Sequence, residues 1–209
     1  PGLGIDFIHD IAGDDLLILD YSLGDGANVS GVVFTGTSLQ RSDLVTGAIL
    51  DRITANGFER FRMTGGSKAD DLRGGPGADV LSGGGSPVGE MDRLRGGGGS
   101  DVFVLTTVSR AQGTTVIDDF TPSQGDRLQL AGLGEAYLLG SSPIIGTPGT
   151  ALYQDSNGNR VLDIESDTLI GILVSPEALT QSNVIDSAEF ESTISPDSIG
   201  LNPHAIGTA

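Results

Sequence analysis

Four consecutive glycine- and aspartate-rich repeats limit the folds open to this chain more than any other feature of its sequence. Each repeat begins with Gly-Gly and places an aspartate two positions before a large apolar residue. A flexible glycine-rich linker is the alternative, but a linker has no reason to keep this register four times. The repeats are GGSKADDLR (65–73), GGPGADVLS (74–82), the longer GGGSPVGEMDRLR (83–95) and GGGGSDVFV (96–104).

The spacing within each repeat suits the coordination chemistry of calcium. Calcium takes about 6–8 oxygen ligands from carboxylates and backbone carbonyls, and glycine tolerates the positive φ angles that aim several carbonyls at one point. After the aspartate, a short strand would point its middle residue into a core. We therefore expect stacked turns with calcium between them, pairing Asp70 with Asp92 and Asp79 with Asp101. The predicted ligands within the repeats are Gly65, Gly66, Asp70, Gly74, Gly75, Gly77, Asp79, Gly83, Gly84, Asp92, Gly96, Gly97, Gly99 and Asp101.

Two repeats depart from the pattern. Lys68 stands where the first repeat should have glycine, so the first turn is expected to bind weakly or to act as a cap. The insertion Ser86–Met91 breaks the third turn; Glu90 there is either a further oxygen ligand or a solvated loop residue, and the second interpretation is favoured.

Composition excludes several classes of function. The formal charge is −17, with 21 Asp against only 7 Glu, so nucleic acid and anionic membrane surfaces are not expected partners. The chain has no cysteine and therefore no disulfide or thiolate metal site. No apolar run reaches the ~18 residues of a membrane span, and the first residues do not resemble a signal peptide.

The repeats resemble those of the RTX (repeats-in-toxin) family of bacterial secreted proteins. The resemblance is specific over 65–104 and extends through TVIDDF (115–120) and GDRLQL (125–130), which are similar to the segment after the roll in serralysin-type C-terminal domains. It implies that Asp119 and Asp126 also lie near calcium, although acidic residues in a plain strand-turn-strand remain an equal alternative.

The resemblance also implies a secreted, extracellular bacterial protein that a type I secretion machine exports. The sequence is compatible with export of an unfolded chain, because clustered aspartates repel one another and glycine-rich turns are costly to order where calcium is scarce. Extracellular calcium modules bind with Kd of about 10⁻⁴–10⁻³ M, so calcium outside the cell would drive folding by mass action.

These observations predict an all-β chain: a parallel β-roll flanked by strand-rich capping segments. The expected divisions are a strand-rich flank (1–63), the roll (64–105), a strand-rich cap (106–190) and a polar tail (191–209). A helix is expected to begin at Ser175. Strands are expected at 15–22, 29–36, 47–53, 58–63, 114–120, 126–132, 151–155, 160–164 and 168–174.

The segment Asp155–Asn159 supports two interpretations. Its alternating oxygen side chains resemble the start of an EF-hand loop, but Arg160 and Ser166 occupy positions that such a loop gives to glycine and an acid. The pair Asn157-Gly158 between two apolar runs favours a hairpin.

No enzyme motif is present in the sequence. The HExxH and GxSxG patterns are absent, and His9 and His204 lie near opposite ends. The predicted function is therefore a non-catalytic, calcium-binding C-terminal part of a larger secreted protein. The alternatives are a calcium-dependent carbohydrate- or cell-surface-binding module and the non-catalytic tail of a secreted hydrolase.

Overall fold

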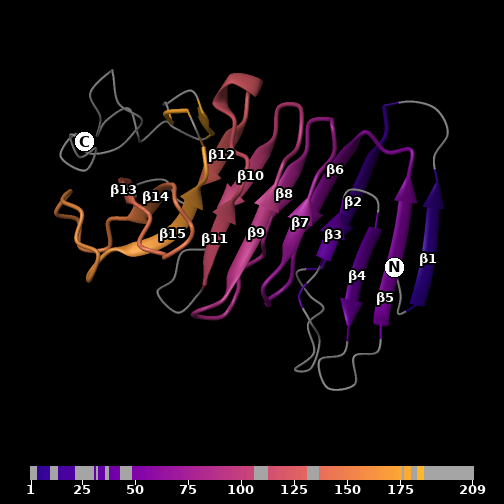
Figure 1. The fold of residues 1–209 in the computed structure, drawn as a ribbon, viewed down its shortest axis with the longest axis horizontal. Helices are drawn as coiled ribbons and strands as arrows, with labels where there is room; N and C mark the ends of the chain where they lie inside the picture. The colour runs from indigo at the N-terminus through magenta and orange to yellow at the C-terminus, as the bar shows by residue number, and fades with distance from the viewer. Residues whose placement is uncertain are drawn as a thin grey trace.

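The strands of the chain form two sheets that lie against each other (Figure 1). The computed structural model of the protein describes residues 4–9, 14–21, 31, 33–35, 38–42, 49–105, 113–130, 137–175, 177–179 and 183–185. The one helical element that lies wholly within these residues is a short 3-10 turn, η1 (Pro122–Gln124).

The smaller sheet has six strands, and every neighbouring pair in it is parallel. Its strands, in spatial order, are β16 (Val184–Ile185), β12 (Arg127–Leu130), β10 (Val102–Leu105), β8 (Val80–Ser82), β6 (Arg60–Thr64) and β2 (Leu16–Asp20).

The larger sheet has ten strands and is mixed. The pairs β3–β4, β4–β5, β13–β14 and β14–β15 are antiparallel, and the other neighbours are parallel. Its strands, in spatial order, are β1 (Gly4–His9), β5 (Ile49–Asn56), β4 (Ser38–Ser42), β3 (Val33–Thr35), β7 (Asp71–Arg73), β9 (Met91–Arg95), β11 (Thr114–Ile117), β15 (Thr168–Leu173), β14 (Thr150–Gln154) and β13 (Tyr137–Ser141).

The predicted fold, a parallel β-roll between separate capping segments, is therefore wrong. Antiparallel strands on both sides of the repeats keep the chain in one sheet instead of passing it to the other. These flanking strands do not form separate caps, because they extend the same ten-stranded sheet that contains the repeat strands β7 and β9. Antiparallel neighbours need only a short local connection, which the repeat periodicity does not reveal.

Between β6 and β12 the chain passes from one sheet to the other after every strand. A flexible linker is excluded there, because the strands of all four repeats are paired. The middle residue of each repeat strand is buried in the core between the sheets, as the pattern predicts. These four residues are Leu72, Leu81, Leu94 and Phe103, each at most 1% exposed.

Several predicted elements outside the repeats differ from the structure. The run 160–164 is part of a loop that spans 155–167, and the described residues 177–179 are not helical. Strands β1, β4, β13 and β16 were not predicted. Parts of the predicted strand 29–36, the position 176 after Ser175 and the predicted tail 191–209 lie outside the described residues.

Candidate functional site

The glycine pairs of the repeats lie in the turns that carry the chain between the sheets. Because successive turns fall at opposite ends of the strands, the turns of alternate repeats stack on one another. Turns 65–70 and 83–92 share one edge, and turns 74–79, 96–101 and 118–126 share the other. The structure thus brings together the predicted pairs, Asp70 with Asp92 and Asp79 with Asp101.

The aspartates of these turns form two ladders. In three of them, one carboxylate oxygen accepts a hydrogen bond from the backbone N–H of the aspartate in the adjacent turn. Asp92 Oδ1 accepts from Asp70 (3.1 Å), Asp101 Oδ1 from Asp79 (2.9 Å) and Asp126 Oδ1 from Asp101 (3.0 Å). Backbone carbonyls and carboxylates of adjacent turns therefore lie in register. All five of these aspartates are at most 2% exposed: Asp70, Asp79, Asp92, Asp101 and Asp126.

The second carboxylate oxygen usually closes its own turn. Asp70 Oδ2 accepts from the Gly66 N–H (2.8 Å), and Asp79 Oδ2 accepts from the Gly75 N–H (2.7 Å). In the fourth repeat the equivalent donor is the Gly97 N–H, which instead donates to Asp119 Oδ2 (3.0 Å).

Asp119 thereby leaves Asp101 with an unsatisfied oxygen. The other oxygen of Asp119, Oδ1, accepts a hydrogen bond from the Gly96 N–H (3.0 Å), so Asp119 binds the first two amides of the fourth turn. Asp101 Oδ2 is buried and has no hydrogen-bond partner. A buried carboxylate oxygen without a donor is costly unless a cation or a proton satisfies it.

Burial raises the pKa of several aspartates in the ladders. The pKa of Asp101 rises to about 7, mainly through loss of hydration and further through the negative charges of Asp126, Asp79 and Asp119. Loss of hydration also raises the pKa of Asp92 to about 7, with a smaller contribution from the charge of Glu90. Ionising these groups therefore opposes folding in the absence of a compensating positive charge.

Glycine is required where stacked turns approach most closely. Gly97 has φ +96° and Gly99 has φ +100°. A Cβ on Gly97 would clash with the carbonyl oxygen of Gly75, and one on Gly99 would clash with that of Gly77. The carbonyls of turn 74–79 thus face the backbone of turn 96–101, so that carbonyl oxygens and carboxylates line the same narrow edge.

Side chains alone do not make a metal site at these edges. Within the described part of the chain, no three Asp, Glu, His or Cys side chains converge on a point where they could hold one metal ion. An ion between two stacked turns would therefore take most of its oxygens from backbone carbonyls and water, with one or two carboxylates. Calcium accepts such a donor set, since it binds carbonyls as readily as carboxylates.

The structure places the two aspartates suggested by the family resemblance differently. Asp126 continues the ladder of Asp79 and Asp101, whereas Asp119 binds backbone amides through both of its oxygens. The neighbouring Asp118 forms ion pairs with Arg93 (2.6 Å) and Arg95 (2.8 Å), which sequence reasoning missed.

Glu177 also reaches this edge of the molecule. Its carboxylate accepts hydrogen bonds from the Ser123 N–H (2.8 Å) and the Ser123 hydroxyl (2.6 Å), and its charge contributes to the raised pKa of Asp126. No local signal marks a contact between residues so far apart in the sequence.

Lys68 and Glu90, where the first and third repeats depart from the pattern, both lie at the edge formed by turns 65–70 and 83–92. Lys68 is half-buried in the first turn. Glu90 Oε2 accepts a hydrogen bond from the Ala69 N–H (3.2 Å), so the inserted residue binds the first turn. Glu90 is thus more than a solvated loop residue, although its oxygen is already engaged by protein.

The hairpin predicted at Asn157-Gly158 is wrong. Strands β14 and β15 are antiparallel neighbours, but the loop 155–167 joins them instead of a tight turn. The oxygen side chains bind the loop's own backbone: Asp155 accepts from the Gly158 and Arg160 amides, both at 2.8 Å. Asp167 likewise accepts from the amides of Asp163 (2.7 Å) and Ser156 (3.2 Å). The alternating pattern therefore serves to order the loop.

Comparison with known proteins identifies no relative of this chain: no family model, no curated protein and no solved structure matches it. Among the residues that the structure describes, there is no helix with the length and apolar character needed to cross a membrane.

Proposed function

We propose that this chain is a secreted, RTX-type calcium-binding domain that folds when it binds extracellular calcium. In this proposal it forms the C-terminal part of a larger bacterial protein exported by type I secretion, and it has no catalytic role of its own. The repeat pattern and the family resemblance motivate the proposal, and the geometry of the turns is compatible with it.

The observation that carries the proposal is the unsatisfied oxygen of Asp101. Its Oδ2 is buried without a donor, and loss of hydration, together with the charges of neighbouring carboxylates, raises the pKa of the group. Protein folds rarely leave a buried carboxylate in this condition unless a proton, an ion or a function accounts for it. A divalent cation would supply the missing positive charge at this point.

The residues of the two stacked turns 74–79 and 96–101 would hold that ion. Asp101 and Asp79 would contribute carboxylate oxygens, and the glycine-rich backbone would contribute carbonyls. The pair Asp70 and Asp92 would do the same at the other edge. Calcium would bridge adjacent turns and neutralise the repulsion between their aspartates, and this linkage couples binding to folding.

Circular dichroism tests the proposal directly. Calcium is titrated into chelator-treated protein while the far-ultraviolet β signal is recorded, and magnesium provides the control. We expect a cooperative gain of β signal at sub-millimolar to low-millimolar calcium and none with magnesium, because magnesium demands a smaller octahedral site. A chain already folded in chelator and unchanged by calcium would refute calcium-triggered folding.

A further inference from the structure

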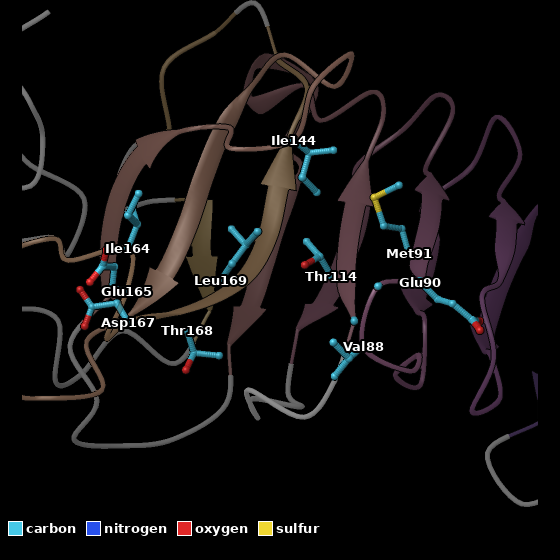
Figure 2. A pocket seen from close by; sticks show the side chains of 12 residues that line it. Val88, Glu90, Met91, Thr114, Ile144, Ile164, Glu165, Asp167, Thr168 and Leu169 are labelled. Carbon is cyan, nitrogen blue, oxygen red and sulfur yellow. The ribbon is translucent and has the colours of Figure 1, made fainter.

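A groove of about 590 Å³ lies on the face of the ten-stranded sheet that points away from the main core. Figure 2 shows its floor, to which β9, β11, β15 and a neighbouring loop contribute Met91, Thr114, Leu169 and Ile144. This volume is in the range of sites that hold small ligands or a few residues of a peptide.

Two irregular segments build the walls of this groove. One wall is the insertion of the third repeat, which the other three repeats lack; its residues Val88, Gly89 and Glu90 line the groove. The opposite wall comes from the end of loop 155–167, where Ile164, Glu165 and Asp167 line the groove. The two places where the chain departs from short, regular connections therefore meet at a single surface feature.

Hydrogen bonds hold both walls in place without a ligand. The insertion is fixed to the start of β11, because the Gly113 N–H donates to the Ser86 carbonyl (2.6 Å) and the Thr114 N–H donates to the Glu90 carbonyl (3.3 Å). On the other side, the Asp163 N–H donates to Asp167 Oδ2 (2.7 Å). The groove is thus preformed, which lowers the entropic cost of binding.

Each wall of the groove carries one exposed aliphatic side chain. Val88 on one wall and Ile164 on the other are each 67% exposed. Ile145 and Val161, exposed at 101% and 54%, lie in the loops 142–149 and 155–167, which contribute lining residues, but do not line the groove themselves. Val88 and Ile164 thus add exposed apolar surface to a groove whose floor already includes Met91, Ile144 and Leu169, and such apolar surface is typical of binding sites.

The charge at the groove is negative. Glu165 is exposed, and its carboxylate forms no hydrogen bond or ion pair with the described residues. The carboxylate of Glu90 turns away from the groove (Figure 2) and binds the Ala69 amide instead. Glu165 is therefore the acidic group that remains available to a ligand. None of the twelve lining residues is aromatic, so the groove offers no platform for stacking a sugar ring.

We propose that this groove binds a short peptide segment in which an aliphatic side chain is flanked by lysine or arginine. The aliphatic side chain would lie between Val88 and Ile164, and the basic group would face Glu165. The charge of the whole chain, −17, would favour the approach of such a segment. This interaction surface is separate from the aspartate ladders and does not depend on which ion they hold.

Fluorescence anisotropy with labelled synthetic peptides tests the proposal, using full-length chain in calcium-containing buffer. The probes are Leu-Lys-Leu-Lys-Leu, its acidic counterpart Leu-Glu-Leu-Glu-Leu, and Ser-Lys-Ser-Lys-Ser, which retains charge without apolar side chains. We expect saturable binding of the first peptide and binding at least about tenfold weaker for the other two. The variants V88S and I164S should each weaken binding about fivefold to tenfold, because each removes apolar contact area. The matched control V161S changes an exposed residue of loop 155–167 that does not line the groove, and it should leave binding unchanged.

Charge recognition is tested separately with E165Q. This variant should weaken binding of the Leu-Lys peptide about threefold at low salt and have no effect at high salt, where surface charges are screened. Circular dichroism would verify that each variant is folded. Absence of saturable binding, equal binding of the Ser-Lys peptide, or equal loss in V161S and V88S would each overturn the proposal. Failure here would leave the calcium titration unaffected, so the two proposals are tested independently.

Discussion

Replacing Asp101 by Asn should change stability in opposite directions with and without calcium. The amide keeps an oxygen that can accept the Asp79 N–H, but it removes the negative charge from a buried position surrounded by carboxylates. Without calcium, that charge opposes folding, so D101N should be more stable than the native chain. With calcium, the same charge binds the ion, so D101N should be the less stable of the two.

The size of the calcium-free effect follows from the pKa. Burial, together with the neighbouring carboxylates, raises the pKa of Asp101 from its ordinary value of 3.8 to about 7. Because the folded pKa lies above the unfolded pKa, stability is greatest below pH 3.8 and falls as the pH rises through this window. The shift corresponds to roughly 4 kcal/mol at pH 8 and to less than half of that at pH 5. We therefore expect D101N to gain about 2–4 kcal/mol at pH 8 in chelator and clearly less at pH 5.

The assay is urea unfolding followed by circular dichroism, in chelator and in saturating calcium. In calcium, D101N should bind the ion at least about tenfold more weakly and melt at a lower temperature than the native chain. D71N is the matched control: it removes the same charge one residue beyond Asp70, where the side chain is 29% exposed and pairs with Arg73 (3.0 Å). Its effect should stay within about 0.5–1 kcal/mol in both conditions. A loss of stability in chelator for D101N, equal to its loss in calcium, would refute the reasoning.

Three further outcomes are expected. The calcium-free chain should gain β signal as the pH falls from 8 to 5, because protonation removes the buried charges of Asp92 and Asp101, whose pKa is about 7. A flat or inverse pH profile in chelator would contradict this. G97A should lower the free energy of unfolding by more than about 2 kcal/mol, since it combines a positive φ with a clash against the Gly75 carbonyl. G89A, with φ +86° but open space around it, should lower it by only about 1 kcal/mol. L81A should lower the free energy of unfolding by about 2–5 kcal/mol because Leu81 is fully buried, while I18A, at a position 60% exposed, should lower it by under about 0.5 kcal/mol. Urea unfolding in calcium measures all four of these glycine, leucine and isoleucine variants. Equal losses within either pair would contradict the packing described above.

The repeats could be interpreted from the sequence because their signal is both local and periodic. The fixed interval between each aspartate and the apolar residue after it identifies the short strands and their buried middle residues, as at Leu81. The same interval places the turns of alternate repeats beside each other. The flanks lack such a repeat: the polar strand Ser38–Ser42 has no apolar alternation, and it forms because its two neighbours pair with it. Tertiary pairing of this kind overrides local propensity.

Part of the site also depends on contacts that the sequence does not reveal. The paired aspartates follow from the repeat, but the role of Asp119 does not, since its carboxylate binds the amides of Gly96 and Gly97 more than twenty residues earlier. That contact leaves the Asp101 oxygen unsatisfied. The pair Asn157-Gly158 in the loop 155–167 predicts a hairpin, because Asn-Gly favours tight turns. The carboxylate of Asp155 instead captures two backbone amides and holds the chain in a longer loop.

A crystal structure of the chain grown in calcium, with anomalous diffraction collected to locate the ion, tests the central claim most directly. The proposal predicts a calcium peak between turns 74–79 and 96–101, with Asp101 Oδ2 among the ligands at about 2.3–2.6 Å. The same experiment should show carbonyl oxygens of both turns around that peak. A folded chain in which Asp101 Oδ2 is met by a proton or by water, with no calcium at either edge, would contradict it.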